Sequence, residues 1–145
     1  MRILAVDLGM ARTGLAVSDS GEQLASPVRT ITQYYQPERM AAQVAQEAEK
    51  QGVGLIVVGH PRNMDGSCGE SARRAEAFAS LLQEQSGLPV KLWDERMTTV
   101  TAIGYLNEAD VRGKKRKAVV DTVAATIILQ DFLEHRRLMR EREGT

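Results

Sequence analysis

Residues 1–20 read MRILAVDLGMARTGLAVSDS, and they indicate the start of a sheet. They also place a carboxylate at the end of a buried strand. The run ILAV at positions 3–6 is apolar on both faces, which is typical of a strand that is covered on both sides. Asp7 follows at once, and an isolated ionised carboxylate in such a place costs several kcal/mol unless something compensates it. Asp7 therefore either pairs with nearby Arg12 or belongs to a functional site, and this stretch alone leaves both readings open.

The composition is typical of one globular domain. The chain has 145 residues, of which 43% are hydrophobic and 26% are charged, so we expect a single domain over residues 1–145, with a tail frayed from about residue 139. No apolar stretch is long enough to span a bilayer, and the first residues are strand-like rather than secretory. The lone Cys68 has no second thiol for a disulfide, which fits a reducing compartment. These features predict a cytoplasmic protein without a membrane partner.

Charge constrains the partners, because 19 basic residues balance 19 acidic ones and leave a net charge of zero. A nucleic acid would have to be held by local patches rather than by a global positive field. One candidate is RGKKRK at residues 112–117, with five basic residues in six, although a solvated loop would look the same. A second basic stretch, HRRLMRER at residues 135–142, is mixed with glutamate and resembles a solvated helix end.

Hydrophobic periodicity and turn residues predict the order of the elements. Three strands come first, and their turn signals indicate an antiparallel meander. Helices then alternate with two further strands, so the fold class is α/β, with a five-stranded mixed sheet flanked by helices. The expected strands span residues 2–8, 14–20, 26–32, 53–61 and 88–96, and the expected helices 37–51, 70–87, 98–111 and about 117–138.

Acidic residues gather where such a sheet carries its functional crevice, beyond the carboxyl ends of the parallel strands. Asp7 ends the first strand, and Asp94 and Glu95 end the last one. Asp121 lies on the closing helix, and apolar residues stand three, four and seven positions after it, which turns its face toward the sheet. We therefore expect at least three carboxylates at one rim.

Clustered carboxylates repel one another, and a hard divalent cation would remove that cost. Mg²⁺ or Mn²⁺ suits carboxylates, water and phosphate oxygens, whereas we find no His/Cys ligand cluster that would indicate zinc. Two such ions about 4 Å apart can activate a water and stabilise the leaving oxygen of a phosphodiester. The acids thus favour metal-assisted phosphodiester hydrolysis.

Four motifs in chain order resemble the YqgF (RuvX-like) family over nearly the whole chain. They are DLGMARTGLAVSD at 7–19, VGHPRNMDGS at 58–67, WDERMTT at 93–99 and RKAVVDTVAATIIL at 116–129. The resemblance implies a ribonuclease H-like fold related to the RuvC resolvases, and a nuclease that matures the 5′ end of the small-subunit (16S) ribosomal RNA precursor, in the context of a pre-ribosomal particle.

The resemblance also implies which residues act. By position, the family's catalytic and metal-binding acids fall on Asp7, Glu95 and Asp121, which leaves Asp94 a supporting role. His60 departs from the aliphatic residue expected there, and we interpret it as a packing or solvent-facing substitution rather than a catalyst.

Polar and basic residues around these acids are the candidates for nucleic-acid contacts. Arg12 either clamps a phosphate or neutralises Asp7. Asn63 lies in a turn-rich loop whose composition turn chemistry alone could explain. The predicted nucleic-acid-binding residues are Arg12, Asn63, Arg96, Thr98, Lys114, Lys115, Arg116 and Lys117.

The sequence therefore predicts a divalent-metal-dependent nuclease, monomeric or homodimeric, with structured RNA as the favoured substrate. One alternative is a Holliday junction resolvase acting on branched DNA, which would need a dimer to cut symmetric strands. Another is a non-catalytic nucleic-acid-binding factor in transcription or ribosome assembly, which three intact acids disfavour. The D-x-G-x-x-x-x-G pattern also opens actin-like ATPases, but those need two such domains.

Overall fold

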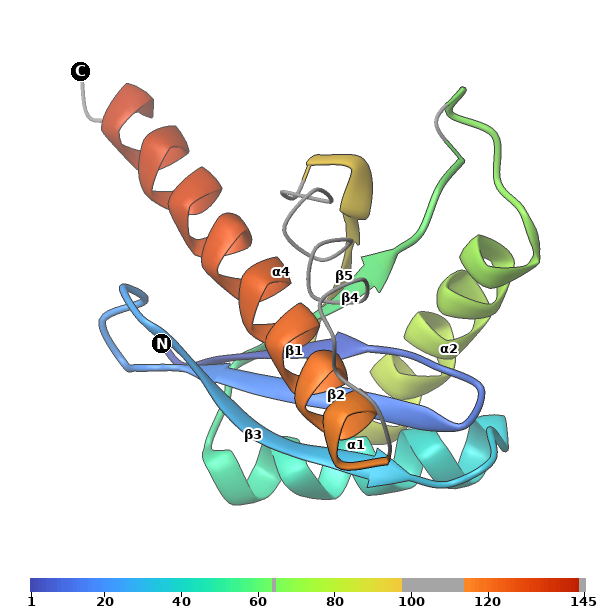
Figure 1. Ribbon diagram of the computed structural model, residues 1–145. Helices are drawn as coiled ribbons and strands as arrows, with labels where there is room; N and C mark the ends of the chain where they lie inside the picture. Colours follow the sequence, from blue (N-terminus) through green and yellow to red (C-terminus); the bar gives the residue numbers. More distant parts are fainter. Residues whose placement is uncertain (64, 98–113, 144–145) are drawn as a thin grey trace.

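The structure, a computed structural model, describes residues 1–63, 65–97 and 114–143, without the side chains of residues 97 and 114–121. Its elements follow one another closely along the chain (Figure 1). They are β1 (Ile3–Asp7), β2 (Arg12–Ser18), β3 (Ala25–Thr32), α1 (Pro37–Gln51), β4 (Leu55–His60), α2 (Glu70–Ser86), β5 (Val90–Asp94), the short 3-10 helix η1 (Glu95–Met97) and α4 (Lys114–Glu143).

The five strands form one mixed sheet in the order β3-β2-β1-β4-β5. β1 pairs with β2, and β2 with β3, in antiparallel fashion. β4 then joins the other side of β1, and β5 joins β4, both in parallel. The predicted α/β fold, with an antiparallel meander followed by parallel strands, is therefore confirmed.

Local signals explain why the two helices of the central segment begin and end where they do. α1 starts at Pro37, whose fixed φ and missing N–H suit the first helical position. It ends at Gly52, and α2 ends at Gly87, both in the left-handed conformation that glycine adopts without strain, with φ of 66° and 71°. These ends agree with the predicted helices to within one residue.

The sheet separates two apolar clusters, because successive strand residues point to opposite faces. Figure 1 shows α1 and α2 on one face and α4 alone across the other. Leu4 and Val6 of β1 pack in the cluster under α1 and α2, whereas Ile3 and Ala5 pack in the cluster under α4. The position that follows in the second series is Asp7, so its side chain faces α4.

The closing helix differs most from its prediction. α4 runs from Lys114 to Glu143 rather than from 117 to 138. The basic residues 114–117 therefore belong to its first turn, and their interpretation as a loop is wrong. The stretch 135–142 is not merely a solvated helix end either, because two of its arginines bind Glu22. The helix expected at residues 98–111 lies outside the described residues.

Glu22 explains why α4 stays helical to its end. Its Oε1 accepts hydrogen bonds from Arg136 Nε and Arg140 Nη2, each at 2.8 Å, and its side chain is only 7% exposed. These bonds anchor the last turns of α4 to the turn between β2 and β3. Arginines in the last turns also suit the negative end of the helix dipole.

Candidate active site

A row of residues across three strands positions Asp7. Asp7 at the end of β1 pairs in register with Gly14 of β2, and Gly14 pairs with Thr30 of β3. The Thr30 hydroxyl lies 2.8 Å from the hydroxyl of Thr122 on α4, so this row lies on the face that α4 covers. Gly14 is buried and adds no side chain beside the half-buried Asp7 carboxylate.

The turn after β1 requires glycine at position 9. A Cβ on Gly9 would overlap the carbonyl oxygen of Arg12, so any other residue would push the chain apart there. Its N–H donates to the Thr13 hydroxyl at 3.4 Å. This tight return places Arg12, which is half-buried, at the start of β2 and close in sequence to Asp7.

Glu95 reaches the same face of the sheet from the other side. It follows β5 directly, at the start of η1, and its carboxylate lies over Gly59 of β4. A Cβ on Gly59 would come within 3.2 Å of Glu95 Oε1 and 3.1 Å of Ile128 Cδ1 on α4. Val6 and Val58 pair in register, so Gly59 is the next residue beside Asp7. The two carboxylates therefore project from the carboxyl ends of β1 and β5, on the face under α4.

Electrostatics distinguish the two adjacent acids at the end of β5. Burial raises the pKa of Glu95, and the neighbouring Asp94 carboxylate raises it further. The hydrogen bond from Arg96, helped by its charge, instead lowers the pKa of Asp94. Arg96 donates to Asp94 from both Nε and Nη2, with the shortest distance 2.7 Å. Asp94 thus has a cationic partner, which fits the supporting role predicted for it.

The loop between β4 and α2 is organised by its own polar groups. The Asn63 side chain donates to Ser67 Oγ at 3.0 Å, and Ser67 Oγ donates to Asp65 Oδ1 at 2.6 Å. Gly66 takes a positive φ of 89° between them. Turn chemistry therefore accounts for Asn63, and a contact between Asn63 and nucleic acid stays a prediction.

The remaining predicted residues are placed only in part. Position 121 lies in α4, directly before Thr122, whose hydroxyl contacts the row that contains Asp7. The side chain of Asp121 is not described, and Thr98 lies outside the described residues. Of the basic run, the structure describes only the helical backbone; this holds for Lys114, Lys115, Arg116 and Lys117.

The structure also brings together a group that sequence reasoning missed. His60, Cys68 and Glu76 offer metal-ligand atoms that all lie within 4.8 Å of one another. The prediction that the chain lacks a His/Cys ligand cluster is therefore wrong, as is a solvent-facing His60, which is buried. No sequence motif signals this group, because its members come from a strand, a loop and a helix that only the fold brings together.

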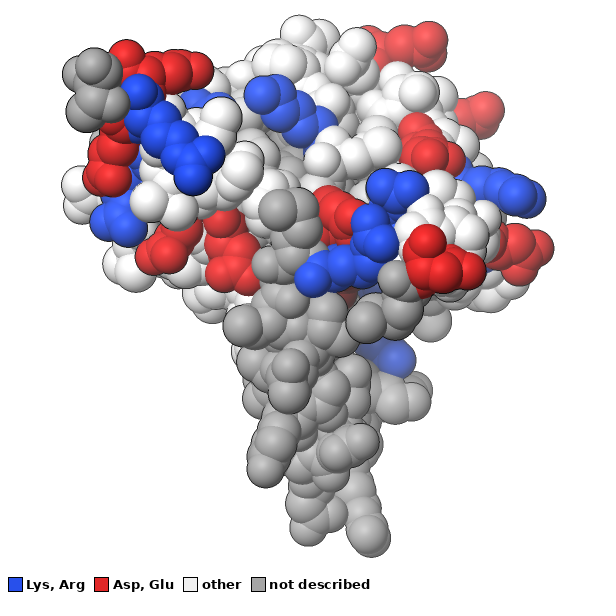
Figure 2. Space-filling view, turned by 90° about the horizontal axis from the view of Figure 1, so that it is seen from above, with Lys and Arg blue, Asp and Glu red and all other residues white. Residues whose placement is uncertain are grey.

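Two further observations concern the surface charge and the length of the helices. On the face seen in Figure 2, basic and acidic side chains are interspersed, as expected for a chain with no net charge. Within the described residues, no helix combines the length and the apolar character that a membrane span requires.

Solved structures share this fold. RuvC from Thermus thermophilus superposes with a TM-score of 0.55 over 93% of this chain and 96% of that one, at 13% identity. The same protein in complex with a Holliday junction substrate gives a TM-score of 0.56 at equal coverage. The fold is thus the ribonuclease H-like fold of RuvC, with carboxylates at the carboxyl ends of its parallel strands.

Sequence comparison narrows this class to one family. The model described as "RuvX: Holliday junction resolvase" matches residues 1–135, and the chain belongs to this family. A relative from Pelotomaculum thermopropionicum, named "Putative pre-16S rRNA nuclease", is 44% identical over 99% of this chain and 94% of its own length. A relative of the same name from Geobacillus thermodenitrificans is 43% identical over 94% of this chain and its full length.

Proposed function

We propose that this nuclease of the RuvX family cleaves structured RNA with the help of a divalent metal, and that its substrate is the small-subunit ribosomal RNA precursor. The observation that carries the proposal is the placement of the Asp7 and Glu95 carboxylates on one face, with glycine at positions 14 and 59 beside them. The names of the relatives at 42–44% identity support the substrate.

The residues at this face fit a hard cation. Glu95 is half-buried, its raised pKa reflects burial and a like charge, and a divalent cation would offset both effects. Asp7, Glu95 and Asp121 would hold Mg²⁺ or Mn²⁺ through oxygen, the ligand atom that these ions prefer. When bound, the ion supplies activation of water and stabilisation of the leaving oxygen of the phosphodiester.

The chain's own side chains would position the nucleic acid. Gly59 leaves room for Glu95, and the pairing of Asp94 with Arg96 fixes the start of η1, where Glu95 lies. Arg96 keeps 31% of its side chain exposed, so a phosphate could still share its guanidinium. Arg12 begins β2, next in space to the turn that follows Asp7.

The first turn of α4 supports a basic nucleic-acid contact. It contains four cationic residues at positions 114–117 and no acidic one. Cations at a helix N-terminus oppose the helix dipole, so this composition does not serve helix stability. Phosphate binding would explain why the first turn of α4 is basic. The residues proposed to bind phosphate are Lys114, Lys115, Arg116 and Lys117.

One copy of the chain contributes all three proposed acids, so cutting a single RNA strand needs no second copy. Symmetric cleavage of a four-way junction needs two active sites related by a two-fold axis. We further propose that the protein acts in the cytoplasm, on a pre-ribosomal particle, as a monomer or homodimer.

A cleavage assay with two substrates tests the proposal. The full chain is incubated with Mg²⁺ or Mn²⁺ and either a precursor RNA that spans the 5′ end of the small-subunit ribosomal RNA or a four-way DNA junction. We expect metal-dependent cleavage of the RNA, and a loss of at least about 100-fold in rate for Asp7→Asn and Glu95→Gln, since each removes a ligand of the ion.

Glu84→Gln is the matched control, because it neutralises an exposed glutamate of α2. It should cleave like the parent chain. Cleavage of the junction alone would favour the resolvase alternative. Binding of RNA without any cleavage would favour a non-catalytic factor, and near-normal rates for Asp7→Asn would remove this residue from the site.

A further inference from the structure

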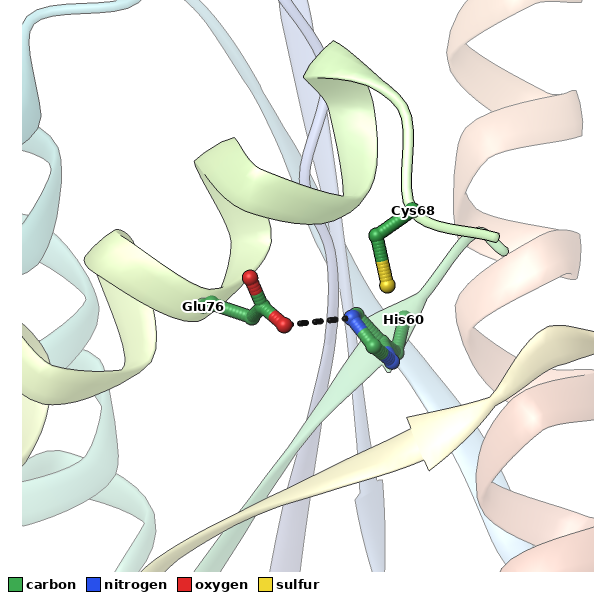
Figure 3. Close-up of side chains that lie close together, drawn as sticks. All are labelled: His60, Cys68 and Glu76. Carbon is green, nitrogen blue, oxygen red and sulfur yellow. Dashed lines mark ion pairs between the residues drawn. The ribbon is translucent and has the colours of Figure 1, made fainter. Parts of the chain in front are cut away.

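A second cluster of metal-ligand side chains lies on the opposite face of β4 from Glu95. Figure 3 shows His60 at the end of β4, Cys68 in the following loop and Glu76 on α2, with their side chains turned toward one another. Gly59 faces α4, so the next residue, His60, faces α2. The cluster is therefore separate from the carboxylates of the proposed active site.

The spacing of the three side chains suits one small ion. His60 Nε2 lies 3.3 Å from Glu76 Oε1. Two ligands of a tetrahedral zinc ion, each about 2.1 Å from the metal, lie about 3.4 Å apart. All three ligand atoms fall within 4.8 Å of one another, so a modest closure of Cys68 would complete three corners of a tetrahedron.

The histidine nitrogen supplies an independent observation. His60 is only 9% exposed, and its Nε2 has no hydrogen-bond partner despite the nearby carboxylate. Buried polar atoms in native proteins almost always have a hydrogen-bond partner, so a bound ion would complete the surroundings of this nitrogen. His60 Nε2 and Glu76 Oε1 form an ion pair at 3.3 Å if the imidazole is protonated, and the same separation suits two ligands of a shared ion if it is neutral (Figure 3).

Charge and donor type identify the ion. A Cys68 thiolate and the Glu76 carboxylate together carry two negative charges, which a divalent cation neutralises, while His60 binds as neutral imidazole. Sulfur and imidazole nitrogen select zinc over magnesium, which prefers oxygen alone. Glu76 is 44% exposed, so water can reach a fourth position.

We propose that His60, Cys68 and Glu76 form a Zn²⁺ site, with three protein ligands and a water in the fourth position. The ion joins the end of β4, the loop of residues 61–69 and α2. It therefore fixes the loop that carries Asn63, which borders the proposed nucleic-acid surface. Binding deprotonates the Cys68 thiol and releases one proton to the solvent for each ion bound.

Cobalt titration of the reduced, metal-free full chain tests the site directly, because a Co²⁺–thiolate bond gives a charge-transfer band in the near ultraviolet. With excess Mg²⁺ present to occupy the carboxylates of the proposed active site, we expect one thiolate-bound Co²⁺ per chain, the band, release of about one proton, and displacement by Zn²⁺. Cys68→Ser should abolish the band. His60→Leu and Glu76→Gln should each weaken Co²⁺ binding at least about tenfold.

Asp7→Asn and Glu84→Gln are the controls, and both should bind Co²⁺ with the band unchanged. Absence of the band in the parent chain overturns the proposal without any variant, so a misfolded variant cannot decide the outcome. If His60→Leu and Glu76→Gln both bind Co²⁺ as tightly as the parent chain and keep the band, Cys68 binds the ion alone. That result would also overturn the proposal. Loss of the band in Asp7→Asn would assign the ion to the other face.

Discussion

Glu95 lies over Gly59, so closely that a Cβ on Gly59 would come within 3.3 Å of its carboxylate carbon. This contact crosses from β5 to β4, the strand that separates β5 from β1. The glycine leaves the volume that the Glu95 carboxylate fills, between β4 and Ile128 of α4. The position of a proposed catalytic acid thus depends on a missing methyl group on β4, the strand next to that of Asp7.

Replacement of Gly59 by alanine should displace Glu95. The new methyl group would meet Glu95 and Ile128 at 3.1–3.3 Å, so these neighbours must move by a few tenths of an ångström. We expect Gly59→Ala to lower the cleavage rate about tenfold or more, because small misplacements of catalytic groups are costly. The loss of stability should stay near 1 kcal/mol, within the range of a tight but adjustable contact.

Gly69→Ala is the matched control for this substitution. A Cβ at Gly69 would meet its nearest atom at 3.8 Å, and its φ of −88° suits any residue. Cleavage by Gly69→Ala should equal that of the parent chain. Equal cleavage rates for Gly59→Ala and the parent chain would mean that the position of Glu95 does not matter for catalysis.

Glu95→Gln should stabilise the metal-free protein at neutral pH. Burial, followed by the charge of Asp94, raises the pKa of Glu95 above its ordinary value of 4.5, so ionisation of Glu95 costs folding free energy. This cost is absent below the pKa of the unfolded state, grows as pH rises from there to the pKa of the folded state, and is constant above it. In chelator, the melting temperature of the variant should exceed that of the parent at pH 7, and the two should converge below about pH 4.

Saturating Mg²⁺ should shrink or invert this difference, because the ion binds the native parent chain and adds stability through mass action. Thermal unfolding of both proteins, in chelator and in Mg²⁺, measures the effect. A variant that melts well below the parent in chelator at pH 7 would instead show Glu95 to be a structural partner.

The basic first turn of α4 should control the salt dependence of binding. If Lys114 and Lys115 contact phosphates, changing both to alanine weakens binding about equally on all RNA sequences. It should also flatten the slope of log affinity against log salt by about one for each lost contact. The double variant Arg39→Ala and Lys50→Ala, on α1 across the sheet, serves as the control. An unchanged slope would mean that residues 114–117 do not contact phosphates and are only a solvated helix end.

Glu22 should stabilise the fold in a pH-dependent way. Burial alone would raise its pKa, but the hydrogen bonds from Arg136, Arg140 and the chain's first amino group outweigh it and lower the pKa to about 2. The contribution is therefore present above the ordinary value of 4.5 and is lost as pH falls from there toward 2. Glu22→Gln should cost about 2 kcal/mol at pH 7 and little near pH 2.

Urea unfolding at several pH values measures this loss, with Glu134→Gln, an exposed position of α4, as the control. A pH-independent difference between Glu22→Gln and the parent would mean that the variant disturbs packing rather than a charge.

The fold could be predicted because its signals are local. The apolar run at positions 3–6, the glycines that end α1 and α2, and Pro37 each act within a few residues, and they set the element order. The limits of α4 could not be predicted in this way. Its C-terminal turns are held by Glu22, more than 110 residues earlier in the chain, and its first turn is rich in cations that ordinarily avoid a helix N-terminus.

The candidate site was predictable to a similar degree. Asp7 and Glu95 stand out because each is an acid at the end of an apolar strand, and parallel strands bring such ends to one rim. No pattern in the sequence relates Gly59 to Glu95, since their contact depends on which strands are neighbours. The proximity of His60, Cys68 and Glu76 could not be predicted for the same reason. It depends on the loop between β4 and α2, which brings Cys68 back to the end of β4.

Gly59 and His60 are consecutive, yet strand geometry sends them to opposite sides of the sheet. Carboxylates alone therefore gather on one side, whereas a thiol, an imidazole and a carboxylate gather on the other, with the backbone of β4 between them. Zinc binds most mixed donor sets more tightly than magnesium does, so an enzyme that uses magnesium is exposed to mismetallation. The proposed zinc site begins one residue away, on the other face of β4, so the two proposed sites offer different donors to the two ions.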